Sequence, residues 1–154
     1  MRMFGGERAS ILKNPWHVQI CLQQFDLKKN HCNLVMCGAA LIKMGKPTHK
    51  HPGIVLTAAH CVTSQGRVIP KNDVNLYMGS NKPTQGSKFR VKKIVVHPKF
   101  DIATMEHDIA ILILPDVVGY SKNIQGILLP KLEEQTPPKN NYCKVSGFGL
   151  NCEA

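Results

Sequence analysis

Short strand-like runs, separated by loop-forming residues, are the feature of this sequence that most limits its possible folds. The runs at residues 18–25 and 74–78 alternate apolar and polar side chains, as strands with one buried face do. No long segment shows the 3.6-residue period of an amphipathic helix. The pattern predicts an all-β sandwich or barrel with strands at residues 18–25, 35–42, 54–58, 74–78, 89–96 and 109–114.

The run at residues 109–114 is apolar throughout and predicts a central strand that is buried on both faces. Between the runs, residues 43–53, 63–73 and 79–87 are rich in Gly, Pro, Lys and Asn, and predict loops. Residues 131–141 contain Pro137-Pro138 and predict an extended linker, which a β-prone stretch at residues 142–148 follows. We therefore expect one domain over residues 1–130, and a linker with the first strand of a second unit over residues 131–154.

The charge balance is strongly basic, with 20 Lys and Arg residues against 10 Asp and Glu residues and a net charge of +10. Such an excess attracts polyanions, including sulfated glycans, nucleic acids and anionic lipid head groups. The alternative is a solubilising surface without a dedicated partner. No apolar run approaches the roughly 18 residues that a membrane span requires, so we expect no membrane association.

Six cysteines in a chain of 154 residues predict an oxidising compartment, and therefore secretion or a secretory granule. The N-terminus shows no apolar signal segment, so this expectation rests on the cysteines. Cys21 and Cys32 flank a polar loop at residues 23–31, which is compatible with a disulfide across a hairpin.

His60 follows directly after a predicted buried strand, in the segment Leu-Thr-Ala-Ala-His-Cys at residues 56–61. Small residues before it permit a tight turn, and a disulfide at Cys61 would hold the imidazole as a catalytic base must be held. Asp108 precedes the most hydrophobic run, where a carboxylate needs a hydrogen-bond donor such as an imidazole N–H. The alternatives are a structural histidine and an aspartate that caps a turn.

Six segments, in sequence order, resemble the motifs of chymotrypsin-like or trypsin-like serine proteases. Residues 57–61 (Thr-Ala-Ala-His-Cys) match the histidine motif letter for letter, and residues 108–112 (Asp-Ile-Ala-Ile-Leu) match the aspartate motif. The 48-residue separation of His60 and Asp108 is also typical of the family. The other segments are Pro-Trp-His-Val-Gln at 15–19, Cys-Gly-Ala-Ala-Leu-Ile at 37–42, Val-His-Pro-Lys-Phe at 96–100 and Cys-Lys-Val-Ser-Gly-Phe-Gly at 143–149.

The resemblance implies the family's first six-stranded antiparallel Greek-key barrel, followed by the start of its second barrel. It implies that His60 is the general base of a His/Asp/Ser triad and that Asp108 orients it. It also implies a disulfide between Cys37 and Cys61. In the family the counterpart of Cys143 pairs with a cysteine of the second barrel, so here Cys143 pairs with Cys152 or stays free.

Residues 2–6 (Arg-Met-Phe-Gly-Gly) resemble a zymogen activation site that is cleaved between Arg2 and Met3. Met3 and Phe4 stand where the family has Ile-Val, which puts insertion of the new N-terminus into an activation pocket in doubt.

The nucleophile of the family lies in a Gly-Asp-Ser-Gly-Gly segment of the second barrel, and this sequence contains no such segment. Without a serine and oxyanion donors, acyl transfer loses its covalent step and its main electrostatic stabilisation. We therefore predict that this chain alone does not hydrolyse peptides.

The place where trypsins bind calcium corresponds to residues 79–93, which contain no Asp or Glu. Because hard cations need oxygen ligands, we expect no calcium there and no cofactor elsewhere. The stretch instead offers an anion-binding set, or a basic strand edge that discourages pairing: Lys82, Lys88, Arg90, Lys92 and Lys93.

Two zinc sites are weaker alternatives: one at His49 and His51, and one built from Cys32, Cys37, His60 and Cys61.

Two functions remain open at this point. The first is a partial chain of a trypsin-like endopeptidase that acts on proteins or peptides. The second is a secreted, non-catalytic relative that binds a sulfated polyanion or a protein, with nucleic acid not expected as a partner.

Overall fold

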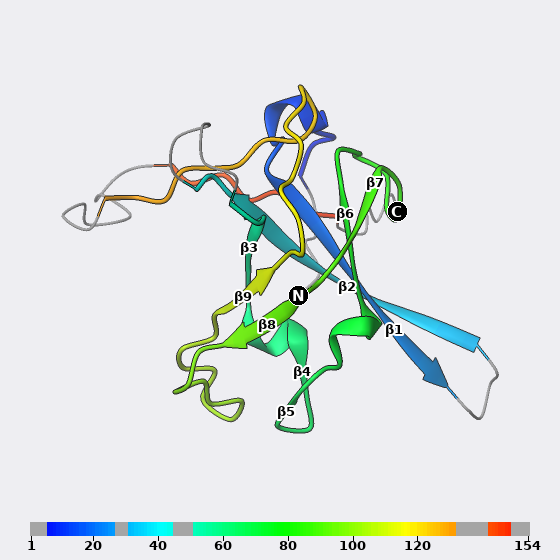
Figure 1. The fold of residues 1–154 in the computed structure, drawn as a ribbon, viewed down its shortest axis with the longest axis vertical. Helices are drawn as coiled ribbons and strands as arrows, with labels where there is room; N and C mark the ends of the chain where they lie inside the picture. Colours follow the sequence, from blue (N-terminus) through cyan, green and yellow to red (C-terminus); the bar gives the residue numbers. More distant parts are fainter. Residues whose placement is uncertain (1–5, 27–30, 45–50, 132–141, 149–154) are drawn as a thin grey trace.

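The computed structural model describes residues 6–26, 31–44, 51–131 and 142–148. Its main element is one antiparallel sheet in the order β7-β6-β1-β2-β3-β9-β8 (Figure 1). The strands are β1 (His17–Asp26), β2 (His31–Ile42), β3 (Ile54–Thr57), β6 (Val74–Met78), β7 (Ser87–Arg90), β8 (Lys93–Val96) and β9 (Ala110–Ile113). Short elements complete the described residues: the hairpin β4 (Thr63–Ser64) and β5 (Arg67–Val68), and the 3-10 helices η1 (Ile11–Lys13), η2 (Ala59–Val62) and η3 (Lys71–Asp73).

The sheet curls until its two edge strands meet. β7 and β8 stand at opposite ends of the sheet order, yet only Val91 and Lys92 separate them in sequence. The backbone N–H of Lys92 already donates to the carbonyl of Ile113 in β9, at 2.8 Å. A single bent stretch therefore pairs with β6 at one end and with β9 at the other. The predicted all-β fold is confirmed, and the predicted run at residues 89–96 is divided at Val91.

The core fills the inside of the curled sheet. Along β6 the side chains alternate, so that Val74, Leu76 and Met78 are buried while the residues between them are half-buried. β1 pairs with β6 from Val18 opposite Met78 and contributes its even-numbered apolar residues to the core, while its odd-numbered residues from His17 to Cys21 are buried as well. The residues of this core that are buried to 1% exposure or less include Val18, Ile20, Leu41, Val55, Ala59, Val62, Val74, Leu76, Ala110, Leu112 and Leu114.

The prediction that the run at residues 109–114 is buried on both faces is wrong. Leu112 is fully buried, but Ile109 and Ile111 are 43% and 38% exposed. β9 is central in the sense that β3 and β8 pair with it on either side. Its outer face, however, has no second layer over it in the described part of the chain.

Two segments differ from their predicted structure. Residues 63–73 contain the β4–β5 hairpin, whose turn residues Gln65 and Gly66 both have positive φ angles of 50° and 72°. Two positive φ angles in succession are the geometry of a tight two-residue hairpin, which a glycine eases. Residues 142–148 form no strand in this structure, and Tyr142 and Val145 are exposed.

No helix among the described residues is long and apolar enough to span a membrane.

Candidate active site at the barrel rim

The turn that carries His60 is held at both ends. Strand β3 ends at Thr57, whose hydroxyl donates to the Gly38 carbonyl of β2 at 3.0 Å. The chain then enters η2 through Ala58, and the next residue, Ala59, is fully buried in the core. At the other end the hydroxyl of Thr63 donates to the Ala59 carbonyl, also at 3.0 Å. The position of the His60 backbone therefore follows from the packing of β3 and η2.

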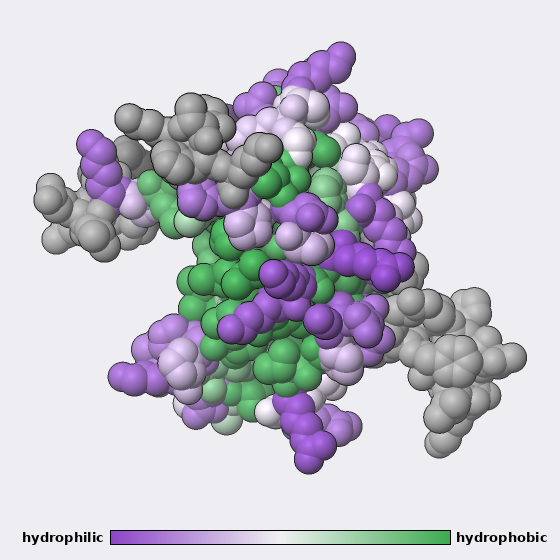
Figure 2. All heavy atoms as spheres, in the orientation of Figure 1, coloured by the Kyte–Doolittle hydropathy of each residue, from purple (hydrophilic) through white to green (hydrophobic). Residues whose placement is uncertain are grey.

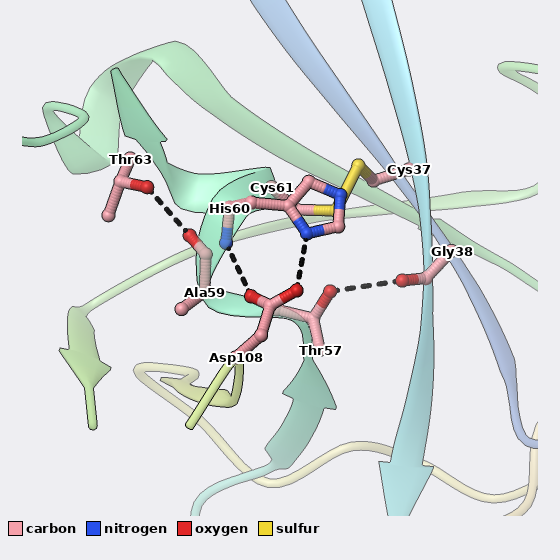
Figure 3. Close-up of a disulfide and its surroundings, with 8 residues drawn as sticks. All are labelled: Cys37, Gly38, Thr57, Ala59, His60, Cys61, Thr63 and Asp108. Carbon is pink, nitrogen blue, oxygen red and sulfur yellow. Dashed lines mark hydrogen bonds and ion pairs between the residues drawn. A yellow bond between two sulfur atoms is a disulfide. The ribbon is translucent and has the colours of Figure 1, made fainter. Parts of the chain in front are cut away.

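A disulfide ties this turn to the neighbouring strand. Cys37 of β2 and Cys61 of η2 are joined, with their Cα atoms 6.1 Å apart, as the resemblance implied (Figure 3). The link closes the chain segment that contains β3 and lies directly beside the imidazole of His60. The disulfide and the two hydroxyl contacts together hold η2 against the sheet.

Asp108 binds His60 through both of its oxygens. Oδ1 accepts from the backbone N–H of His60 at 2.8 Å, and Oδ2 lies 2.7 Å from the imidazole Nδ1 (Figure 3). Because the carboxylate can only accept, the ring nitrogen Nδ1 carries the proton. The other ring nitrogen, Nε2, lies 3.6 Å from Sγ of Cys61, and sulfur is a weak partner. Nε2 is therefore the nitrogen left to accept a proton from a further group.

The electrostatics of the pair favour a charged Asp108. Partial burial acts to raise the pKa of its carboxyl group, but the hydrogen bonds from the His60 backbone and imidazole, and its attraction to that imidazole, bring the pKa below the usual value. The side chain of His60 is 34% exposed and that of Asp108 is 19% exposed. The carboxylate is thus sheltered, while the imidazole remains open to a molecule at the rim.

The loop before Asp108 is shaped by contacts that the sequence analysis missed. The ring of His107 stacks on that of His97, with centroids 4.7 Å apart. The backbone of His107 has a φ of 53°, a conformation that costs a non-glycine residue about 1 kcal/mol or more. The N–H of Asp101 donates to the Glu106 carbonyl at the base of the same loop. In the sequence, His97 belongs to the His-Pro motif, and the position of His107 directly before Asp108 is the one signal for its role.

The predicted disulfide between Cys21 and Cys32 is absent, because Cys21 is a buried free cysteine. The hairpin register explains the difference. Cys21 lies opposite Met36, whereas Cys32 lies opposite Phe25. Four residues along a strand correspond to about 13 Å, well beyond the Cα separation that a disulfide allows.

Of the two possibilities for Cys143, pairing with Cys152 or staying free, the structure shows the second, with Cys143 exposed. Its proposed partner lies outside the described residues, as do Arg2, Met3 and His49.

The sulfurs of Cys37 and Cys61 and the ring of His60 form the one group with metal-ligand spacing among the described residues, with ligand atoms within 4.8 Å of one another. The two sulfurs are bonded to each other, so neither is the thiolate that zinc requires. The basic side chains predicted to bind anions are all exposed: Lys82, Lys88, Arg90, Lys92 and Lys93.

Hydrolases with a Ser-His-Asp triad pair the imidazole of their base with a carboxylate in the same way as His60 and Asp108 are paired here. The comparisons with known proteins agree. A family model described as Trypsin matches residues 3–153. The chain is 29% identical over 97% of its length to a trypsin of Phaedon cochleariae, and 29% identical over 96% of its length to hypodermin-B of Hypoderma lineatum.

The chain belongs to the trypsin family of serine proteases. It spans about half the length of these curated relatives, 50% of the trypsin and 49% of hypodermin-B.

Proposed function

We propose that this chain contributes the general base and its orienting acid to a serine endopeptidase. The observation that supports it most strongly is the double contact of Asp108 with the His60 backbone and Nδ1, at 2.8 and 2.7 Å. A structural aspartate that only capped the turn would need the backbone contact alone. The second contact fixes the tautomer in which Nε2 is the basic nitrogen.

In the proposed reaction, a serine hydroxyl attacks the carbonyl carbon of a peptide bond while Nε2 of His60 takes its proton. The resulting imidazolium is stabilised by the Asp108 carboxylate, which stays ionised. His60 then returns the proton to the nitrogen of the departing amine, and an acyl-serine remains. A water molecule repeats the same proton transfers to release the acid and regenerate the serine.

We propose that the serine of this reaction lies in a segment that corresponds to the half of the relatives that the chain does not cover. The sequence holds no Gly-Asp-Ser-Gly-Gly segment, and no serine hydroxyl among the described residues hydrogen-bonds to His60. We therefore propose that residues 1–130 form the first barrel, that residues 131–154 lead into a second one, and that the 154-residue chain alone is inactive. Cleavage between Arg2 and Met3 as an activation step, and secretion, belong to the same proposal.

The experiment joins residues 1–154 to the uncovered half of the Phaedon cochleariae trypsin in one polypeptide. The chain alone should neither bind a serine-directed fluorophosphonate nor cleave fluorogenic arginyl, phenylalanyl or alanyl peptides. The fusion should do both. His60→Ala in the fusion should lower kcat by about 10⁴-fold or more, because the serine loses its base. His51→Ala, which changes an exposed histidine outside the site, serves as the matched control.

Two results would contradict the proposal. Labelling of the chain alone would show that it carries its own nucleophile. A folded fusion whose serine reacts with the fluorophosphonate equally fast with and without the His60→Ala substitution would show that His60 is not the base.

A further inference from the structure

The described part of the chain carries a line of cations that the proposed proteolytic reaction does not use. Residues 74–100 contain six of the chain's lysines and arginines and none of its aspartates or glutamates. We use the name basic strip for five of the six: Lys82, Lys88, Arg90, Lys92 and Lys93. All five are exposed, and none forms an ion pair with a described residue.

The barrel structure places three of these cations on one surface. Phe89 and Val91 point inward and pack on the core, so Lys88, Arg90 and Lys92 alternate with them and project outward. Alternate residues of a strand are about 7 Å apart, which is the spacing expected for Lys88 and Arg90 in β7, and Lys92 follows at the bend before β8. Hydrophilic side chains accordingly run across one face of the molecule, over the line from β7 to β8, with hydrophobic side chains beside them (Figure 2).

Neighbouring contacts hold part of the strip in place. The ammonium of Lys88 lies 6.0 Å from the ring centroid of Tyr77, its partner across β6 and β7. The loop that carries Lys82 is pinned to β1, because the N–H of Thr84 donates to the buried side chain of Gln19 at 2.7 Å. β7 and β8 are the two edge strands of the sheet, so the same cations also discourage pairing with another strand.

We propose that the basic strip is a binding site for sulfated glycans. A row of exposed cations along one stretch of chain fits a linear polymer with repeating anionic groups, and it attracts such a polymer through release of counterions. The Cys37–Cys61 disulfide belongs to an oxidising compartment, away from the cytoplasmic leaflet where anionic lipids concentrate. Nucleic acid is disfavoured because Phe89 points into the core and Tyr77 lies under Lys88, which leaves the strip without an open stacking ring.

The test measures binding of the 154-residue chain to heparin as a function of salt concentration, without any activity assay. The variant K88A/R90A/K92A should bind on the order of 100-fold more weakly at physiological salt, and its salt dependence should lose about three counterions. The control K13A/R67A/K71A removes the same charge from exposed residues outside the strip. This control should change the affinity less than about 5-fold.

Comparison ligands make the proposal falsifiable. Chemically desulfated heparin should bind far more weakly than heparin. Equal losses in the two triple variants would show that net charge alone governs binding, and would overturn the site. Tighter binding to duplex DNA or to phosphatidylserine vesicles than to heparin would overturn the assigned partner. Since no step involves His60, a negative result here leaves the proposed reaction untouched.

Discussion

His60 and His17 differ in the hydrogen bonds that their imidazole rings make. At the rim, the imidazole and backbone of His60 are both bound to Asp108, beside a disulfide. His17, at the start of β1, is only 8% exposed, and its Nε2 has no hydrogen-bond partner among the described residues. Its ring instead packs edge-on against Phe148, with centroids 5.3 Å apart. The partner, and not the histidine itself, separates a site for proton transfer from a packing surface.

The difference extends to charge. Burial lowers the pKa of His17, which keeps that imidazole neutral. At the rim, the contacts of His60 lower the pKa of Asp108 and keep the carboxylate charged. The rim therefore holds a charged carboxylate beside its histidine, whereas the buried His17 is neutral. Three measurements can sharpen this contrast or remove it.

The largest effect is expected for the strand that follows Asp108. Leu112 of β9 is fully buried, so Leu112→Ala should lower the free energy of unfolding by about 4 kcal/mol through lost packing and a cavity. Leu128→Ala is the matched control because Leu128 is 71% exposed, and it should change stability by less than about 0.5 kcal/mol. Urea titrations followed by the fluorescence of the single tryptophan measure both. Similar losses in the two variants would mean that burial of Leu112 in the barrel core does not stabilise the fold.

A smaller effect is expected for the disulfide beside His60. The double variant C37A/C61A should lose about 3 kcal/mol of unfolding free energy. It removes a link between cysteines 24 residues apart and so raises the entropy of the unfolded chain. Cys143→Ala removes a free, exposed thiol and should have almost no effect. The same urea titration applies, without reductant. Unchanged stability in the double variant would show that the other contacts of η2 are sufficient.

The smallest effect is expected at His17 and depends on pH. The folded pKa is lowered from 6.5, so the neutral imidazole stabilises the fold fully above about pH 6.5, and this contribution is lost as the pH falls below it. The loss should reach up to about 1 kcal/mol per pH unit. His17→Phe should remove this pH dependence and leave stability at pH 8 nearly unchanged. If the stability of the wild type and of His17→Phe depends on pH in the same way from pH 8 to 5, burial does not lower the pKa of this histidine.

Much of the fold could be predicted because its strands are patterned locally. Alternation places β6 at residues 74–78 in both the prediction and the structure. The β4–β5 hairpin was missed because strands of two residues are too short to show a period. The outer face of β9 was misjudged because uniform hydrophobicity cannot tell whether a second layer covers a strand. Register caused the error at Cys21, since flanking a loop does not place two residues opposite each other.

The site was predictable where it is carried by short motifs. The resemblance pointed to His60, Asp108 and the Cys37–Cys61 pair, and the structure brings all four residues together. The stacking of His97 on His107 could not be predicted, because it joins two loops through a contact that no local pattern records.

The most direct test of the proposed base is the tautomer of His60 in the chain as it stands. Nitrogen-15 NMR of the neutral imidazole should show the proton on Nδ1, where Asp108 accepts it, and an unprotonated Nε2. Asp108→Asn should shift the proton toward Nε2, because the amide can present a donor to Nδ1. A wild-type spectrum with the proton on Nε2, unaltered by Asp108→Asn, would contradict the account.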